Sequence, residues 1–296
     1  MIIDVHVHTF PEKIAAHALE TLSGNSHTRP FSDGTVKGLR ASMSEAGITL
    51  SVIQPVATRQ EQVVRINDTA MKINAGEAAG ILSFGGLHPD FSDWDTELSR
   101  IHEAGIIGIK IHPVYQGVPI DDERYVKILA RAGELGLLVM IHAGFDIGFP
   151  ENDYAIPERI ARALDMAGNV RVILAHMGGW RFWNDAVRFF TGRENVYIDT
   201  AFSLGKFVPN GDGYYSGGDE CIMLRDDEFV DIVRAFGSER VLFGTDSPWA
   251  SQSDCVKAVT SLGLSNDEKE GILHRNALKL LGVAITERMA CAKSPH

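Results

Sequence analysis

Metal-competent side chains stand at the ends of several short apolar segments. His6 and His8 are two residues apart in IDVHVH, so both imidazoles point to the same side of a strand. His142, His176 and Asp246 end three later segments, in LVMIHAG, VILAHMGG and VLFGTDSPW. Imidazole nitrogen and carboxylate oxygen suit zinc and similar cations, which at catalytic sites keep one position open for water. Hydrogen-bonded strand histidines would explain His6 and His8 alone, but the repetition at separate strand ends predicts a metal centre.

The segment GIIGIKIHP adds Lys110 and His112, which are also two residues apart and share a face of their strand. A buried lysine is costly unless it is neutralised or paired. Three interpretations of Lys110 remain open: a carbamylated bridge between two metal ions, a free ammonium that holds a substrate carboxylate, and a partner for an acidic neighbour. His88, in GGLHPDF, either lines the pocket or has a structural role.

Strand-like apolar runs alternate with segments of helical period along the chain, which is the order of βα units in a parallel sheet. The eight expected strands are Ile2–Val7, Leu50–Gln54, Ala79–Gly85, Ile106–Ile111, Leu137–Ile141, Arg171–Ala175, Val196–Asp199 and Arg240–Gly244. Eight such units in 296 residues predict a (β/α)8 TIM barrel with its site at the carboxyl ends of the strands. The alternative, an open doubly wound sheet, usually has a glycine-rich phosphate turn where this sequence has HVHT.

Between the strands, we expect a helix over Glu12–Leu22, a loop over Ser23–Thr35 and a helix over Val36–Ala46. The glycine-rich segment Ser203–Glu220 is expected to be a functional or mobile loop. No linker or short repeat interrupts the pattern. Residues 1–296 are therefore expected to form one domain, with a peripheral tail after about residue 283.

The chain is acidic, with a formal net charge of -11 and a pI of about 5.4. Such a surface repels phosphate backbones and anionic lipids, so we expect a small-molecule substrate and neither nucleic-acid nor membrane partners. No signal peptide and no apolar run of about 20 residues are recognisable. Cys221, Cys255 and Cys291 form no CxxC pair and are expected to be free thiols, which favours a cytoplasmic location. A symmetric homodimer is compatible with an acidic barrel.

Together these segments resemble the amidohydrolase superfamily. The matching pieces run from residue 2 to about residue 282 and are IDVHVH, GIKIHP, VMIHAG, ILAHMGG, FGTDSPW and RNALKLLG. They look most like the amidohydrolase-related branch, the amidohydrolase family 2 group, which also contains decarboxylases and hydratases. The order of the motifs is specific for the superfamily but not for a substrate.

The resemblance implies a set of metal ligands. His6 and His8 match the ligand pair of the first strand, and His142 matches the ligand of the fifth. Asp246 matches the carboxylate of the eighth strand, which contacts the metal and handles the proton of the water. The expected cofactor is one or two divalent ions per chain, zinc first, although manganese, iron and nickel also suit these ligands.

The number of ions depends on two further matches. His176 matches the histidine of the sixth strand, which polarises the substrate or moves protons in mononuclear relatives and binds the second ion in binuclear ones. Lys110 falls where binuclear relatives have a bridging carboxylated lysine or a glutamate. His112 is not part of the general metal pattern, and the resemblance leaves one ion or two open.

Two reactions are compatible with these residues. In the preferred one, a hydrolase cleaves a C–N or ester-like bond with metal-activated water, and Asp246 and His176 are the catalytic residues. In the alternative, a decarboxylase acts on a small carboxylic acid, such as an aromatic one, held by Lys110, Arg59 or Arg181. A barrel that only binds ligands would have no need for proton-transfer groups. The candidate substrate-binding residues are Lys110, His112, His88, Tyr115 and Trp249.

Overall fold

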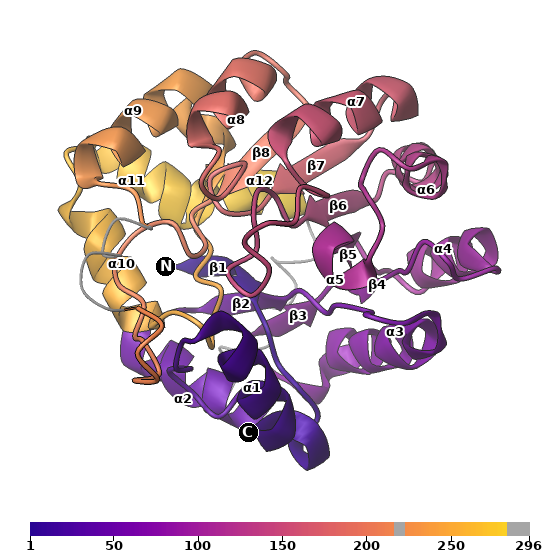
Figure 1. Cartoon of the computed structure of the whole chain (residues 1–296), viewed down its shortest axis with the longest axis horizontal. Helices are drawn as coiled ribbons and strands as arrows, with labels where there is room; N and C mark the ends of the chain where they lie inside the picture. The colour runs from indigo at the N-terminus through magenta and orange to yellow at the C-terminus, as the bar shows by residue number, and fades with distance from the viewer. Residues whose placement is uncertain (216–222, 283–296) are drawn as a thin grey trace.

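The computed structural model describes residues 1–215 and 223–282, in which short strands lie at the centre and helices surround them (Figure 1). The strands are β1 (Ile3–Val7), β2 (Leu50–Ile53), β3 (Ile81–Ser83), β4 (Gly85–Gly86), β5 (Gly108–Ile111), β6 (Leu138–Ile141), β7 (Arg171–Leu174), β8 (Val196–Asp199) and β9 (Val241–Leu242). The helices are α1 (Glu12–Ser26), α2 (Val36–Ala46), α3 (Val63–Lys72), α4 (Trp94–Glu103), α5 (Pro113–Gln116), α6 (Glu123–Glu134), α7 (Pro157–Ala167), α8 (Trp183–Phe190), α9 (Asp226–Phe236), α10 (Gln252–Ser261), α11 (Asn266–Glu270) and α12 (Asn276–Leu281). Short 3-10 or π-helical turns are η1 (Gln60–Gln62), η2 (Ile73–Glu77), η4 (Ser238–Arg240) and η5 (Gly271–Arg275).

The strands pair in parallel, in the orders β1-β2-β3 and β4-β5-β6-β7-β8-β9. β3 and β4 are consecutive halves of one barrel strand, separated only by Phe84, whose amide donates to the carbonyl of Ile53 at 3.0 Å. Backbone bonds also join β1 to the segment that continues β9: Val5 N donates to Phe243 O at 2.9 Å, and Asp246 N donates to His6 O at 2.8 Å. The predicted (β/α)8 TIM barrel is confirmed.

Several expected boundaries differ from the structure: β5 begins at Gly108 rather than Ile106, and β9 is shorter than the expected strand Arg240–Gly244. The predicted third strand, Ala79–Gly85, is divided between β3 and β4. The helix expected over Glu12–Leu22 continues to Ser26, so the first part of the expected loop Ser23–Thr35 is helical. It ends where His27 adopts a left-handed conformation with φ of 58°, which terminates the α-helical hydrogen-bonding pattern.

Local signals in the sequence explain how other helices begin and end. The Thr35 hydroxyl caps α2 by accepting a hydrogen bond from Gly38 N at 3.0 Å, and Gly47 ends the helix with φ of 69°. Asp122 caps α6 in the same way through Arg124 N at 3.0 Å. These caps fix the ends of helices whose apolar faces cover the barrel.

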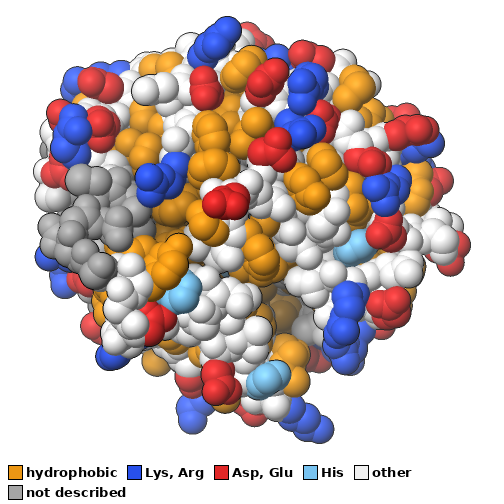
Figure 2. Space-filling model, in the orientation of Figure 1, with side chains coloured by type: hydrophobic (Ala, Val, Ile, Leu, Met, Phe, Trp, Pro, Cys, Tyr) orange, Lys and Arg blue, Asp and Glu red, His pale blue; other side chains and the backbone are white. Residues whose placement is uncertain are grey.

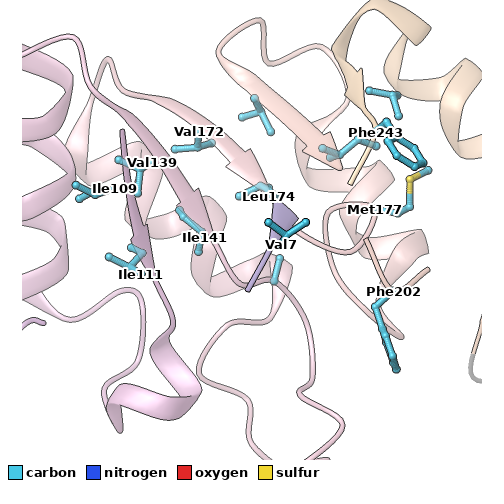
Figure 3. Packing of buried hydrophobic residues seen from close by; sticks show 14 of the residues in the cluster. Val7, Ile109, Ile111, Val139, Ile141, Val172, Leu174, Met177, Phe202 and Phe243 are labelled. Carbon is cyan, nitrogen blue, oxygen red and sulfur yellow. The ribbon is translucent and has the colours of Figure 1, made fainter. Parts of the chain in front are cut away.

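Alternate residues of each strand pack on opposite sides. One set lies between the strands and the helices and includes Ile109, Ile111, Val139, Ile141, Val172 and Leu174 (Figure 3). The other set forms a separate interior cluster that includes Val5, Leu138, Met140, Ile173 and Leu242, together with Leu280 and Leu281 of α12. Lys110 and His142 alternate with the outward set, so the two-residue period of a strand directs them to the interior.

Figure 2 shows acidic and basic side chains interspersed toward the rim of the face that it presents. No helix in the described part of the chain is long and apolar enough to cross a membrane. Of the three cysteines, Cys255 is a buried free thiol, whereas Cys221 and Cys291 lie outside the described residues. The expected tail after residue 283 and the end of the Ser203–Glu220 loop lie outside them as well.

Candidate metal centre

The ends of β1 and β9 bring three potential ligands together. His8 Nε2 lies 3.0 Å from Asp246 Oδ1 and 3.2 Å from His6 Nε2. His6 Nε2 is also 3.5 Å from Asp246 Oδ1. Asp246 adopts a left-handed conformation with φ of 66°, in the turn that aims its carboxylate at the histidines.

A carboxylate that the sequence analysis missed orients His6. Asp199 Oδ2 lies 2.7 Å from His6 Nδ1, and both side chains are buried. Because the carboxylate accepts, Nδ1 carries the ring proton and Nε2 presents a lone pair to His8 and Asp246. Asp199 Oδ1 also accepts from His176 N at 2.9 Å. The sequence feature that could have indicated Asp199 is its place at the end of the expected strand Val196–Asp199.

Lys110 reaches the same group from β5. Its buried Nζ lies 3.3 Å from His6 Nε2. Burial lowers the pKa of Lys110 to about 8, although the carboxylates of Asp199, Asp246 and Asp146 act in the opposite direction. Three carboxylates therefore act on this lysine through their charge, and its ammonium is easier to deprotonate than an exposed one.

His142 and His176 meet beside this group. His176 Nε2 is 3.1 Å from His142 Nδ1, while His176 Nδ1 is 2.9 Å from the carbonyl of Ala201. His176 has a left-handed backbone with φ of 61° at the turn after β7. Its ring lies 5.5 Å from that of His6 and 4.9 Å from that of His142, between centroids, so it stands between the two.

A second acidic residue that the sequence analysis missed, Asp146, lies four residues after His142 in the loop after β6. Its Oδ2 lies 3.5 Å from His112 Nε2 and 3.9 Å from His142 Nε2. The rings of His112 and His142 stack at 4.0 Å, and Tyr115 meets His112 edge-on at 4.4 Å. Burial raises the pKa of Asp146 to about 7, although Gly148 N donates to Oδ1 at 2.8 Å.

The other expected substrate-binding residues have different surroundings. His88 Nδ1 accepts from Asp90 N at 3.1 Å and so stabilises its own turn. Trp249 is half-buried against the core, and its amide donates to Asp246 O at 2.9 Å. Arg59 and Arg181 are exposed.

Charge at the β1–β9 end of the site is dominated by Asp246. Its burial alone would raise the pKa, but the hydrogen bond with His8 and the nearby rings of His6 and His176 lower it to about 2. The carboxylate is therefore ionised at neutral pH and can act as a ligand or as a proton acceptor.

The donor set fits a divalent cation. Among residues 1–215 and 223–282, two groups of three metal-competent side chains have ligand atoms within 4.8 Å of one another: His6, His8 and Asp246, and His112, His142 and Asp146. His142 Nε2 is buried and has no hydrogen-bond partner. Converging ligand atoms, one of them buried without a partner, are an arrangement that a metal ion satisfies.

The sequence matches the family model named Amidohydrolase over residues 3–283. The chain belongs to the amidohydrolase family. The resemblance seen in the strand-end motifs is thereby confirmed for nearly the whole chain. A comparison with curated protein sequences gives no match for this amidohydrolase.

Solved structures share the barrel at low sequence identity. An uncharacterised TIM-barrel protein of Bordetella bronchiseptica aligns with a TM-score of 0.71 and 18% identity over 98% of this chain and 99% of its own. A dihydroxybenzoic acid decarboxylase of Polaromonas sp. JS666 with bound manganese and 2-nitroresorcinol gives 0.65 and 17%, over 95% and 96%. A candidate 2-pyrone-4,6-dicarboxylic acid hydrolase of Pseudomonas putida gives 0.64 and 18%, over 95% and 97%. At these identities the likeness concerns the fold.

Proposed function

We propose that this amidohydrolase is a metal-dependent hydrolase that cleaves a C–N or ester-like bond in a small molecule. The observation that carries the proposal is the charge of the site. Three buried carboxylates, those of Asp146, Asp199 and Asp246, surround Lys110, which is the only lysine or arginine among the buried residues that the structure describes.

This balance favours an uncharged scissile group. The charge of a bound divalent ion favours the ionised forms of Asp146 and Asp199, whose pKa burial otherwise raises. The ion and the ammonium of Lys110 then offset three carboxylates, so little net positive charge remains to attract a substrate carboxylate. The other cations considered for that task, Arg59 and Arg181, are exposed, and Arg181 lies over the ring of Trp180 at 5.7 Å. A neutral amide, ester or lactone needs no such cation.

In this proposal His6, His8 and Asp246 hold the ion. Asp199 fixes the tautomer of His6, as outer carboxylates do for ligating histidines. When bound, a divalent ion supplies Lewis acidity and lowers the pKa of water toward about 7. Asp246 accepts the proton of the attacking water and passes it to the leaving group, because it is ionised and lies beside the other two ligands, 3.0 Å from His8 Nε2.

His176 is assigned a narrower role than the sequence suggested. Its Nδ1 donates to Ala201 O, so Nε2 of the neutral ring carries a lone pair. Burial lowers the pKa of His176, which disfavours the doubly protonated ring. A neutral His176 can accept a proton or bind a cation through Nε2, but it cannot donate a hydrogen bond to an oxyanion from that atom.

Decarboxylation remains a second candidate because of one contact. The Lys110 ammonium lies 3.3 Å from His6 Nε2, where it could hold a carboxylate next to the ion. The manganese-containing decarboxylase of Polaromonas, which shares the fold, shows that such a barrel accommodates this reaction.

A substrate panel separates the two reactions. Metal-loaded enzyme is incubated with neutral amides, esters and lactones and with aromatic carboxylic acids, and the release of acid or CO2 is measured. Hydrolysis of a neutral compound that is lost in His8→Ala supports the proposal. Metal-dependent CO2 release without any hydrolysis would replace it with the lyase.

A further inference from the structure

The first strand changes its pairing register just before the metal group. Asp4 of β1 pairs with Ser51 of β2. Val7 pairs with Ile53, so β1 advances three residues where β2 advances two. The extra residue makes a β-bulge, a local irregularity that changes the direction of the side chains beside it. The bulge lies in the interval that contains His6.

The bulge determines the side of the strand on which His6 lies. Residues two apart in a regular strand share a face, so Asp4 and His6 would point the same way. Asp4 instead points outward, where its Oδ2 accepts from Gln252 Nε2 of α10, one of the surrounding helices, at 2.7 Å. His6 points inward, with its Nε2 3.3 Å from Lys110 Nζ. Without the extra residue, strict alternation would send His6 outward with Asp4, away from the other ligands.

Gln54 holds this bulge from the neighbouring strand. It directly follows β2, and its side chain is buried. Its Nε2 donates to Val5 O at 2.9 Å, and its backbone N donates to Val7 O at 2.8 Å. Val5 and Val7 flank His6, so the two hydrogen bonds of Gln54 fix the β1 backbone on both sides of this histidine.

The carboxamide of Gln54 has one partner. Its Oε1 is buried without a hydrogen bond, and Val5 O is the sole partner of its side chain among residues 1–215 and 223–282. A buried acceptor that stays unpaired costs stability, and an apolar side chain of the same length would avoid that cost. The amide is therefore explained by the bond that it donates to the bulge rather than by a general contribution to stability.

We propose that Gln54 is a positioning residue for the metal centre, which directs His6 Nε2 at the ion by holding the bulge of β1. This role rests on the ion proposed above for His6, His8 and Asp246, and it does not depend on which reaction that ion supports. Asp199 fixes the proton on the His6 ring, whereas Gln54 fixes the direction from which the ring enters the site.

The test compares two buried glutamines of the same chain. Gln252 is the matched control, because it and Gln54 are both 0% exposed and both have an unpaired Oε1. Its Nε2 donates to the carboxylate of Asp4 instead of the β1 backbone. Gln54→Met and Gln252→Met remove the amide and keep the length of the side chain. Competition with a chromophoric chelator measures Co²⁺ affinity, alongside the visible absorption of bound cobalt and urea unfolding of the metal-free proteins.

The two variants should differ in opposite properties. Gln54→Met is expected to bind Co²⁺ about 10–100-fold more weakly than wild type, with a changed absorption spectrum, because one ligand is displaced. Gln252→Met should keep the affinity and spectrum of wild type while its urea midpoint falls. Wild-type affinity and spectrum in Gln54→Met would overturn the role of Gln54. An equal loss of affinity in both variants would overturn it as well, because general loosening would then explain the loss.

A second variant replaces Gln54→Met if that protein does not fold. Gly244→Ala leaves both hydrogen bonds of Gln54 in place, but its Cβ would lie 3.0 Å from His6 Cβ, so the histidine must shift. Co²⁺ affinity should fall here too; unchanged affinity would mean that the ion tolerates a displaced His6 and would remove the basis for a positioning role. A wild type that takes up no cobalt would overturn the ion and the proposed hydrolase together with this role. Failure of the Gln54 effect alone leaves both intact.

Discussion

Two buried polar clusters in this barrel differ in how completely their atoms are satisfied. Asp4 belongs to the first, although it is only two residues before His6 in β1. Its Oδ1 accepts from His6 N at 3.2 Å and Thr245 N at 3.1 Å, and its Oδ2 accepts from Thr245 Oγ1 at 2.6 Å and Gln252 Nε2 at 2.7 Å. Each carboxylate oxygen of Asp4 has two donors, and we call this cluster closed on that account, although Gln252 Oε1 is buried without a hydrogen-bond partner.

The second cluster is open. The potential ligand atoms of His6, His8 and Asp246 lie within 4.8 Å of one another, and His142 Nε2 is buried without a hydrogen-bond partner. Burial alone therefore does not mark a functional site in this molecule, since both clusters are buried. The convergence of metal-competent atoms does, because an added cation can bind several of them at once.

The largest expected effect is on catalysis, in the open cluster. Asp246→Asn removes the proton acceptor and an anionic ligand, so we expect turnover to fall by about 10³-fold or more. The metal-free fold should lose no more than about 2 kcal/mol. Steady-state kinetics on a substrate from the panel, with urea unfolding of the metal-free protein, tests both. Near-normal turnover in Asp246→Asn would end its assignment as a catalytic residue.

A substitution in the closed cluster should lower stability and leave metal binding unchanged. Asp4→Ala removes the acceptor of four donors, of which only Gln252 Nε2 keeps a 3.4 Å contact with Ser51 Oγ, and we expect a loss of about 3–5 kcal/mol in the free energy of unfolding. Metal bound per folded chain should stay unchanged. Urea unfolding measures the loss, with Ser51→Ala as the control, because that change removes only a 3.4 Å contact with Gln252. A similar loss in both variants would contradict the special role of Asp4.

Asp199 shares a feature with each cluster. Both of its carboxylate oxygens accept hydrogen bonds, and it also orients His6 in the open cluster. Asp199→Asn no longer fixes the proton of His6 on Nδ1, so metal affinity should fall by about 10–100-fold. Competition with a chromophoric chelator measures the affinity. If Asp199→Asn binds metal as tightly as wild type, the orientation of His6 must be set by packing alone.

The pH dependence of the metal-free protein should report the ionised state of Asp246. Its pKa of about 2 lies below the usual 3.8, so the ionised carboxylate stabilises the fold above about pH 4. That contribution, about 2 kcal/mol, is lost as the pH falls toward 2. Unfolding of wild type and Asp246→Asn between pH 2 and 6 should show a gap that closes at the acid end. A gap that stays constant over this range would mean that Asp246 has an ordinary pKa.

Much of the fold could be predicted because the barrel repeats one simple pattern. Apolar runs located the eight barrel strands, and Thr35 and Gly47 marked the ends of a helix. The interruption of the third strand at Phe84 and the continuation of α1 to Ser26 were not foreseen. Both depend on pairing with neighbouring strands or on packing over the barrel, which composition does not report.

The sequence by itself determined that His6, His8, His142, His176 and Asp246 end strands, because a residue type following an apolar run is a local property. It also determined which side chains of β5 face inward, since that depends only on the two-residue period of a strand. Only the tertiary structure decided that Asp199 orients His6 and that Asp146 joins His112 and His142. Those contacts join different strand ends and loops, and their geometry is set by the closure of the barrel.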